Sequence, residues 1–102
     1  MITWRAPLYT TESTKGKKRN IMSGIRQHKF QLGVYVVVLS LNGTDIFDLI
    51  PAYMLSKDSY KGSDIKILGI ASGKKDAMEL AAQMIMDVYA RTGELDVRGY
   101  FS

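Results

Sequence analysis

The chain has 102 residues, 46% of them hydrophobic and 24% charged, with a formal net charge of +4. This size predicts one domain with a single hydrophobic core. The lack of cysteine and the single histidine exclude disulfides, thiolate metal sites and any mechanism that needs two histidines. No apolar stretch is long enough to span a membrane and no signal-like run opens the chain, so we expect a cytoplasmic protein without a membrane partner.

The positive charge is concentrated near the N-terminus. Residues 1–31 carry seven basic side chains against one acidic side chain, whereas residues 32–102 carry seven against nine. A local basic segment creates a stronger field at one place than the same charge spread over the surface. The distribution therefore says more about partners than the net charge does.

The first part of the chain is predicted to be an arm followed by a helix. Residues 1–12 show neither a helical nor a strand period, so we expect an extended N-terminal arm, and residues 13–102 are expected to form a single α/β domain. Ser13 or Thr14 can cap a helix that ends near His28. Its narrow apolar stripe consists of Ile21, Met22 and Ile25.

A run of aliphatic residues predicts the central strand. From residue 34 to residue 41, both faces of an extended backbone carry large apolar side chains. Neither face can be left in water, so the strand needs a covering layer on each side. A second such run, residues 65–70, predicts the neighbouring strand.

The segment between these strands gives weaker signals. Residues 42–45 are typical of a turn whose end caps a short helix through Ile46, Phe47 and Leu49. Residues 52–55 fit either a helical turn or a short extended piece, and residues 57–63 fit a polar loop.

The last third of the chain is predicted to contain a long helix and a final strand. Apolar residues repeat at the helical period from Ala77 to Val88, and Gly93 is expected to end the helix in a left-handed conformation. Residues 95–101 alternate between apolar and polar, which is typical of a strand buried on one face. A strand, a helix and a strand with short joints favour a right-handed crossover between parallel strands.

Together these elements predict an α/β fold. We expect one small domain with the succession α-β-α-β-α-β and a three-stranded, largely parallel sheet with helices on both faces. The strand of residues 34–41 is expected at the centre and the strand of residues 95–101 at an edge. This alternation predicts a fold class and not a function.

The C-terminal part of the chain resembles a group of bacterial proteins. The similarity extends over residues 33–101 and is carried by Gly69-Ile70-Ala71-Ser72-Gly73, Ala77, Glu79-Leu80, Tyr89, Thr92-Gly93 and Asp96-Val97-Arg98-Gly99-Tyr100. The group consists of short uncharacterised proteins of Gram-positive bacteria and their mobile elements. The resemblance implies a bacterial cytoplasmic accessory protein, and it transfers no functional residue because the group has no established activity.

The stretch from Gly69 to Lys75 suggests a phosphate-binding loop but lacks its spacing. Such a loop needs four residues between its glycines and a serine or threonine directly after its lysine. Here only three residues separate Gly69 from Gly73, and Lys75 stands after Lys74 in place of the hydroxyl residue. We therefore exclude a P-loop NTPase. The start of the long helix, with Ser72, Gly73, Lys74 and Lys75, remains a candidate anion-binding site, and a solvated helix start is the alternative.

No catalytic motif is recognisable, and we expect a protein without enzymatic activity, cofactor or metal. His28 is expected to interact with carbonyl groups at the end of its helix. The one acidic grouping consists of Asp45, Asp48, Asp58 and Asp64. A helix cap at Asp45 and a solvated position for Asp48 explain this grouping more simply than a metal site does.

The strongest indication of a partner is the basic segment of the predicted N-terminal helix. Its six cations are Lys15, Lys17, Lys18, Arg19, Arg26 and Lys29. Such a cluster fits a nucleic-acid backbone or another polyanion, and Trp4 and Tyr9 upstream could stack on bases. No helix-turn-helix or RNA-binding signature supports base readout, so binding without sequence specificity is the leading hypothesis. A solvated helix face that keeps the protein soluble is the alternative.

Two other functions are weighed against this hypothesis. A protein-protein interaction module or a homo-oligomer would use the sheet edge at residues 95–101 and the methionine-bearing face of the long helix. The third hypothesis, which we rank last, is binding of a phosphorylated small molecule at the start of the long helix, near Ser72.

Overall fold

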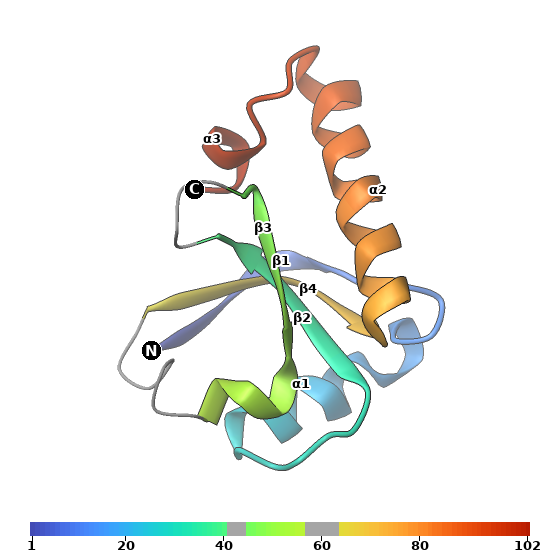
Figure 1. Cartoon of the computed structure of the whole chain (residues 1–102), viewed down its shortest axis with the longest axis vertical. Helices are drawn as coiled ribbons and strands as arrows, with labels where there is room; N and C mark the ends of the chain where they lie inside the picture. Colours follow the sequence, from blue (N-terminus) through green and yellow to red (C-terminus); the bar gives the residue numbers. More distant parts are fainter. Residues whose placement is uncertain (41–44, 57–63) are drawn as a thin grey trace.

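The computed structural model describes residues 1–40, 45–56 and 64–102, which form a four-stranded sheet between helical layers (Figure 1). The strands are β1 (Ile2–Tyr9), β2 (Val34–Leu39), β3 (Phe47–Pro51) and β4 (Ile65–Ser72). Their order across the sheet is β1-β4-β2-β3. β1 and β4 are parallel, and the other two neighbouring pairs are antiparallel.

β2 and β4 form the middle of the sheet because apolar side chains cover both of their faces. Val36, Val37 and Val38 are at most 4% exposed, although successive side chains point to opposite faces. β2 pairs with β4 on one side and with β3 on the other. The predicted central strand and its predicted neighbour are therefore confirmed, while Leu41, which the prediction included, lies outside the described residues.

One face of the sheet is covered by α1 (Lys18–Arg26) and by the 3-10 helix η2 (Ala52–Ser56). A second 3-10 helix, η1 (Lys15–Lys17), leads directly into α1 and buries none of its residues. α1 buries Ile21 and Ile25, as its predicted apolar stripe requires. Residues 52–55, whose sequence fits either a helical turn or a short extended piece, form a helical turn. The basic residues Lys15, Lys17 and Arg19, at the start of α1 and just before it, are exposed to solvent.

The opposite face is covered by α2 (Lys74–Thr92) and α3 (Val97–Phe101) (Figure 1). The predicted long helix is confirmed, and Gly93 ends it with φ 73°, where its N–H donates to the carbonyl oxygen of Tyr89. Within the described ranges, no helix combines the length and the apolar character that a membrane span requires.

The predicted three-stranded, largely parallel sheet is wrong because the N-terminal segment supplies a further strand. Within residues 1–12, β1 joins the edge of the sheet beside β4, with Ile2 opposite Ile65 and Trp4 opposite Ile67. The register shifts between Trp4 and Tyr9, which breaks the period of two that identifies a strand in sequence. The succession therefore begins with a strand, and β1 with β4 is the sole parallel pair among the described strands.

The predicted short helix through residues 46–49 is also wrong, since Ile46 directly precedes β3 and residues 47–49 lie in it. Val37 lies opposite Leu49, and Val36 lies opposite Ile50. The adjacent β3 residues Leu49 and Ile50 therefore pack into the hydrophobic cores on opposite faces of the sheet. The capping role expected for Asp45 fails with that helix. Pairing with β2 outweighs the local helical pattern, as tertiary contacts often do for short segments.

The predicted edge strand at residues 95–101 is replaced by α3. Val97 and Phe101 are 2% and 1% exposed, and a spacing of four residues fits one helix face as well as one strand face. The Asp96 carboxylate accepts a hydrogen bond of 3.1 Å from the Gly99 N–H and caps the helix. Without a strand at this position, the predicted parallel crossover and the predicted C-terminal sheet edge do not exist.

Candidate nucleic-acid interface

The six predicted cations surround the two ends of α1. Lys15, Lys17, Arg19, Arg26 and Lys29 are exposed, and Lys18 is half-buried. In the described part of the chain, none of them forms an ion pair with an acidic group. Their charges are therefore not neutralised by these neighbours, and they create a local positive field. We call these six residues the basic cluster.

Three members of the basic cluster meet at the beginning of α1. A surface hollow of about 320 Å³ is lined by Lys15, Gly16, Lys18, Arg19 and Asn20. Lys17 does not line the hollow but occupies the capping position of α1, where no side-chain cap bond forms. The first turn also contains no acidic residue, so the positive end of the helix dipole adds to the side-chain charge.

The other two members lie at the end of α1. The Arg26 guanidinium lies 5.5 Å from the centroid of the Trp4 ring, which places this side of α1 beside the edge strand β1. A helix rises 1.5 Å per residue, so Lys18 and Arg26 are about 12 Å apart along the axis. The basic cluster is therefore elongated, which suits a linear polyanion better than a small anion.

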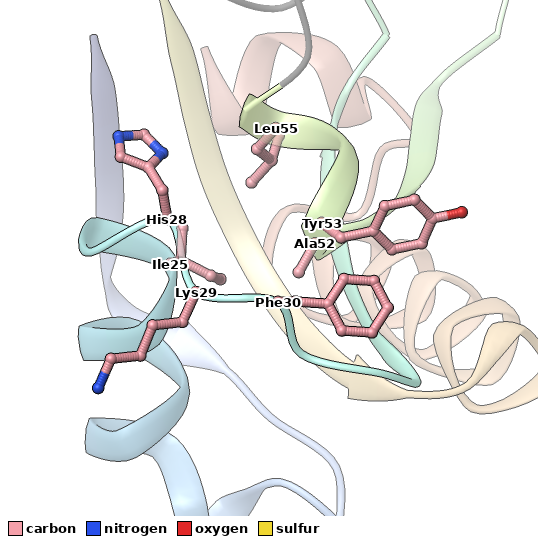
Figure 2. Close-up of a pocket in the computed structure, with 7 residues that line it drawn as sticks. All are labelled: Ile25, His28, Lys29, Phe30, Ala52, Tyr53 and Leu55. Carbon is pink, nitrogen blue, oxygen red and sulfur yellow. The ribbon is translucent and has the colours of Figure 1, made fainter.

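A pocket of about 290 Å³ lies between the end of α1 and η2 (Figure 2). Ile25, Ala52 and Leu55 contribute apolar surface to it. The remaining lining residues are His28, Lys29, Phe30 and Tyr53. Figure 2 shows His28 on the α1 side and the rings of Phe30 and Tyr53 side by side on the other side.

His28 ends α1 in a conformation that glycine usually adopts. Its φ is 56°, its N–H donates to the Ile25 carbonyl oxygen at 3.1 Å, and the Lys29 N–H donates to the Gly24 carbonyl oxygen at 2.9 Å. This pair of bonds forms a Schellman motif. A left-handed conformation costs a non-glycine residue about 1 kcal/mol. The expected contact of His28 with helix-end carbonyls is thus made by its backbone.

Trp4 and Tyr9 contact the body of the protein rather than standing exposed. Trp4 is half-buried against the core on the α1 side of the sheet, and Tyr9 is half-buried against the core on the α2 side. The exposed aromatic pair is instead Phe30 and Tyr53, whose ring centroids are 5.4 Å apart. Sequence reasoning missed this pair because Phe30 lies between two predicted elements, and nothing local connects it to Tyr53.

A second cleft, of about 450 Å³, separates β1 from α2 and also contains arginines. The Tyr9 hydroxyl donates to the Asp87 carboxylate, which also accepts hydrogen bonds from Arg91 Nε at 3.0 and 3.1 Å. The guanidinium of Arg5 donates to the Pro7 carbonyl oxygen and lies 5.0 Å from the Tyr9 ring centroid. Arg5 and Arg91 therefore already have partners within the chain. The hydrogen bond between Tyr9 and Asp87 connects β1 to α2 across this cleft.

The same contacts shift the protonation of Tyr9 and Asp87. Burial, and next the hydrogen bond to Asp87, raise the pKa of Tyr9 to about 12. The hydrogen bond from Tyr9, and next the one from Arg91, hold the pKa of Asp87 below its usual value. The hydrogen bond to Asp87 likewise raises the pKa of Arg91. The group therefore stays in one protonation state, with a neutral tyrosine, across the neutral range.

The start of α2, predicted as an anion site, contains a carboxylate of its own. Asp76 Oδ2 accepts a hydrogen bond of 2.9 Å from the Ser72 N–H and one of 2.7 Å from the Thr11 hydroxyl. The Gly73 N–H donates to the Gly33 carbonyl oxygen. Lys74 and Lys75 are exposed. Anion binding by residues 72–75 stays a prediction, but the Asp76 charge opposes it.

The acidic residues do not gather into a metal site in the described ranges, where no group of three or more His, Asp or Glu side chains has the required proximity. Asp48 and Asp64 line a common hollow of about 140 Å³, which also includes Lys66. Asp58, the other acid of the predicted grouping besides Asp45, lies outside the described residues.

Comparisons of the chain with protein-family models, with curated proteins and with solved structures find no match.

Proposed function

We propose that the protein is a small, non-enzymatic, cytoplasmic accessory protein that binds nucleic acid, without sequence specificity, through the basic cluster. The observation that carries the proposal is the set of six cations around α1, none of which is paired with an acid in the described part of the chain. By contrast, Arg91 in the second cleft is paired with Asp87. Cations that gather in one place without acidic partners among the described residues have the electrostatic footprint of a phosphate-backbone contact.

The shape of the cluster favours a polymer over a small anion. The hollow at the start of α1 and the Arg26–Lys29 end are about 12 Å apart, so only an extended ligand can contact both. Each phosphate that pairs with a cation releases condensed counterions, and several such contacts together give useful affinity. Phosphate contacts of this kind orient a nucleic acid but do not read its sequence.

A pair of charge-reversal variants tests whether the location of the charge matters. Lys18→Glu/Arg19→Glu and Lys74→Glu/Lys75→Glu each lower the formal net charge from +4 to zero. Fluorescence anisotropy with labelled DNA should show strong loss of binding for the first variant and a much smaller loss for the second. Acidic residues in the first turn of α1 suit the helix dipole, so the first variant should fold. Equal losses for both variants would contradict binding at the basic cluster.

A second candidate function is a protein-protein interaction or homo-oligomer through the exposed side of α2. Met78, Met86 and Tyr89 are 56%, 66% and 56% exposed, and they follow helical spacing. The predicted contribution of a sheet edge at residues 95–101 is absent, since these residues contain α3. Sedimentation of the parent chain and of Met86→Asp would test this candidate, which requires a complex that the substitution dissociates.

A further inference from the structure

The aromatic pair near the end of α1 is unusually accessible. Phe30 is 69% exposed even though its ring lies 5.4 Å from that of Tyr53, with an angle of 38° between the ring planes. Tyr53 is 38% exposed. Burying a phenylalanine side chain stabilises a fold, so leaving this ring in water forgoes stability that the protein could otherwise gain. The exposure is informative because the ring also borders a pocket.

The pocket combines two neighbouring aromatic rings, tilted by 38° to each other, with apolar lining from Ile25, Ala52 and Leu55. Phe30 and Tyr53 come from different segments, the α1–β2 connection and η2, and their rings lie on the same side of the pocket (Figure 2). The volume of about 290 Å³ is at the lower limit of small-molecule pockets. A single planar ring system therefore suits it better than a large ligand.

The charge around the pocket is positive. Lys29 belongs to the lining, its side chain points away from the aromatic pair in Figure 2, and Arg26 precedes it at the end of α1. None of the seven lining residues is acidic. A ligand that places a ring against Phe30 and an anionic group near Lys29 would satisfy both features, and a nucleotide within a strand has this composition.

We infer that Phe30 and Tyr53 form a stacking platform for unpaired nucleobases, so that the preferred ligand of the basic cluster is single-stranded nucleic acid. The inference rests on the proposed function, which supplies the backbone contacts. Bases of a duplex are stacked on one another and cannot reach a protein ring unless they leave the helix. In a single strand every base has a free face, and stacking on an aromatic side chain is tolerant of sequence.

The test compares Phe30→Ala with Leu32→Ala. Leu32 is 85% exposed, follows in the same connection and does not line the pocket, which makes it a matched control. Affinities for a labelled oligothymidine and for a duplex of the same length are measured by anisotropy at several salt concentrations. Phe30→Ala should lower the ratio of single-strand to duplex affinity about 10-fold to 100-fold, whereas Leu32→Ala should leave this ratio unchanged.

The salt dependence separates the failure of this inference from the failure of the proposed function. Phe30→Ala removes no cation, so the slope of log affinity against log salt should stay the same while the single-strand affinity falls. Salt-dependent binding with an unchanged affinity ratio in Phe30→Ala would overturn the platform and leave the proposed function intact. A parent chain that binds neither nucleic acid would overturn both. Self-association that Phe30→Ala disrupts, with the ratio unchanged, would assign the pair to a protein contact and likewise overturn the platform.

Discussion

Replacing Phe101 by alanine should strongly destabilise the fold, because this side chain packs α3 against Tyr9 of β1 and Phe47 of β3. Phe101 is 1% exposed, and its ring lies 5.0 Å from that of Tyr100, 5.8 Å from that of Tyr9 and 6.0 Å from that of Phe47. Phenylalanine to alanine in a core costs about 3 to 5 kcal/mol. Aromatic neighbours add to the burial term, so we expect about 4 kcal/mol.

Urea denaturation followed by circular dichroism measures this loss. A domain of this size has a free energy of unfolding of about 5 to 15 kcal/mol, and its urea dependence is about 1 to 3 kcal/mol per molar. The midpoint for Phe101→Ala should therefore fall by more than about 1 M. Leu95→Ala is the matched control, since Leu95 is 66% exposed just before α3, and its effect should stay within about 0.5 kcal/mol. A loss below about 1 kcal/mol for Phe101→Ala would refute the docking of α3 against β1 and β3.

Further outcomes are expected elsewhere in the molecule. Val36→Asp and Val37→Asp should each prevent folding, because either face of β2 would bury an unpaired carboxylate, and a cooperative melt of either variant would show that its face is open to water. Folding raises the pKa of Tyr9 from 10.0 to about 12, so the parent should lose stability as pH rises from 10 to 12, and Tyr9→Phe should reduce this loss in denaturation curves recorded across that range. His28→Gly should raise the free energy of unfolding by about 1 kcal/mol, since glycine adopts φ 56° without strain, and a destabilised variant would contradict that account of the Schellman motif.

The parts of the fold that could be predicted are those whose pattern of apolar residues fits only one kind of secondary structure. β2 and β4 carry apolar residues on both faces, and α2 has a long helical period that ends at Gly93. Residues 95–101 were ambiguous because Val97 and Phe101 share a face in a strand and in a helix. β1 was hidden by the register shift after Trp4, and β3 forms through pairing with β2, which local sequence does not encode.

The charged part of the candidate site could be predicted, and its aromatic part could not. Clustering of Lys15 to Arg19 is visible in sequence because consecutive positions stay close in any fold. Phe30 and Tyr53 are brought together only when η2 packs beside the end of α1. Trp4 and Tyr9 are the more obvious aromatic candidates in the sequence. In the structure, Trp4 packs against the core on one face of the sheet and Tyr9 packs against the core on the other.

The salt dependence of nucleic-acid binding tests the central claim most directly. If about four to six members of the basic cluster contact phosphates, log affinity against log salt should have a slope of about −4 to −5 on duplex DNA. On a single strand the slope should be about −3 to −4, because fewer counterions are released per contact. Arg19→Gln should make the duplex slope shallower by about one unit. A flat salt response, or a slope that Arg19→Gln does not change, would contradict nucleic-acid binding through the basic cluster.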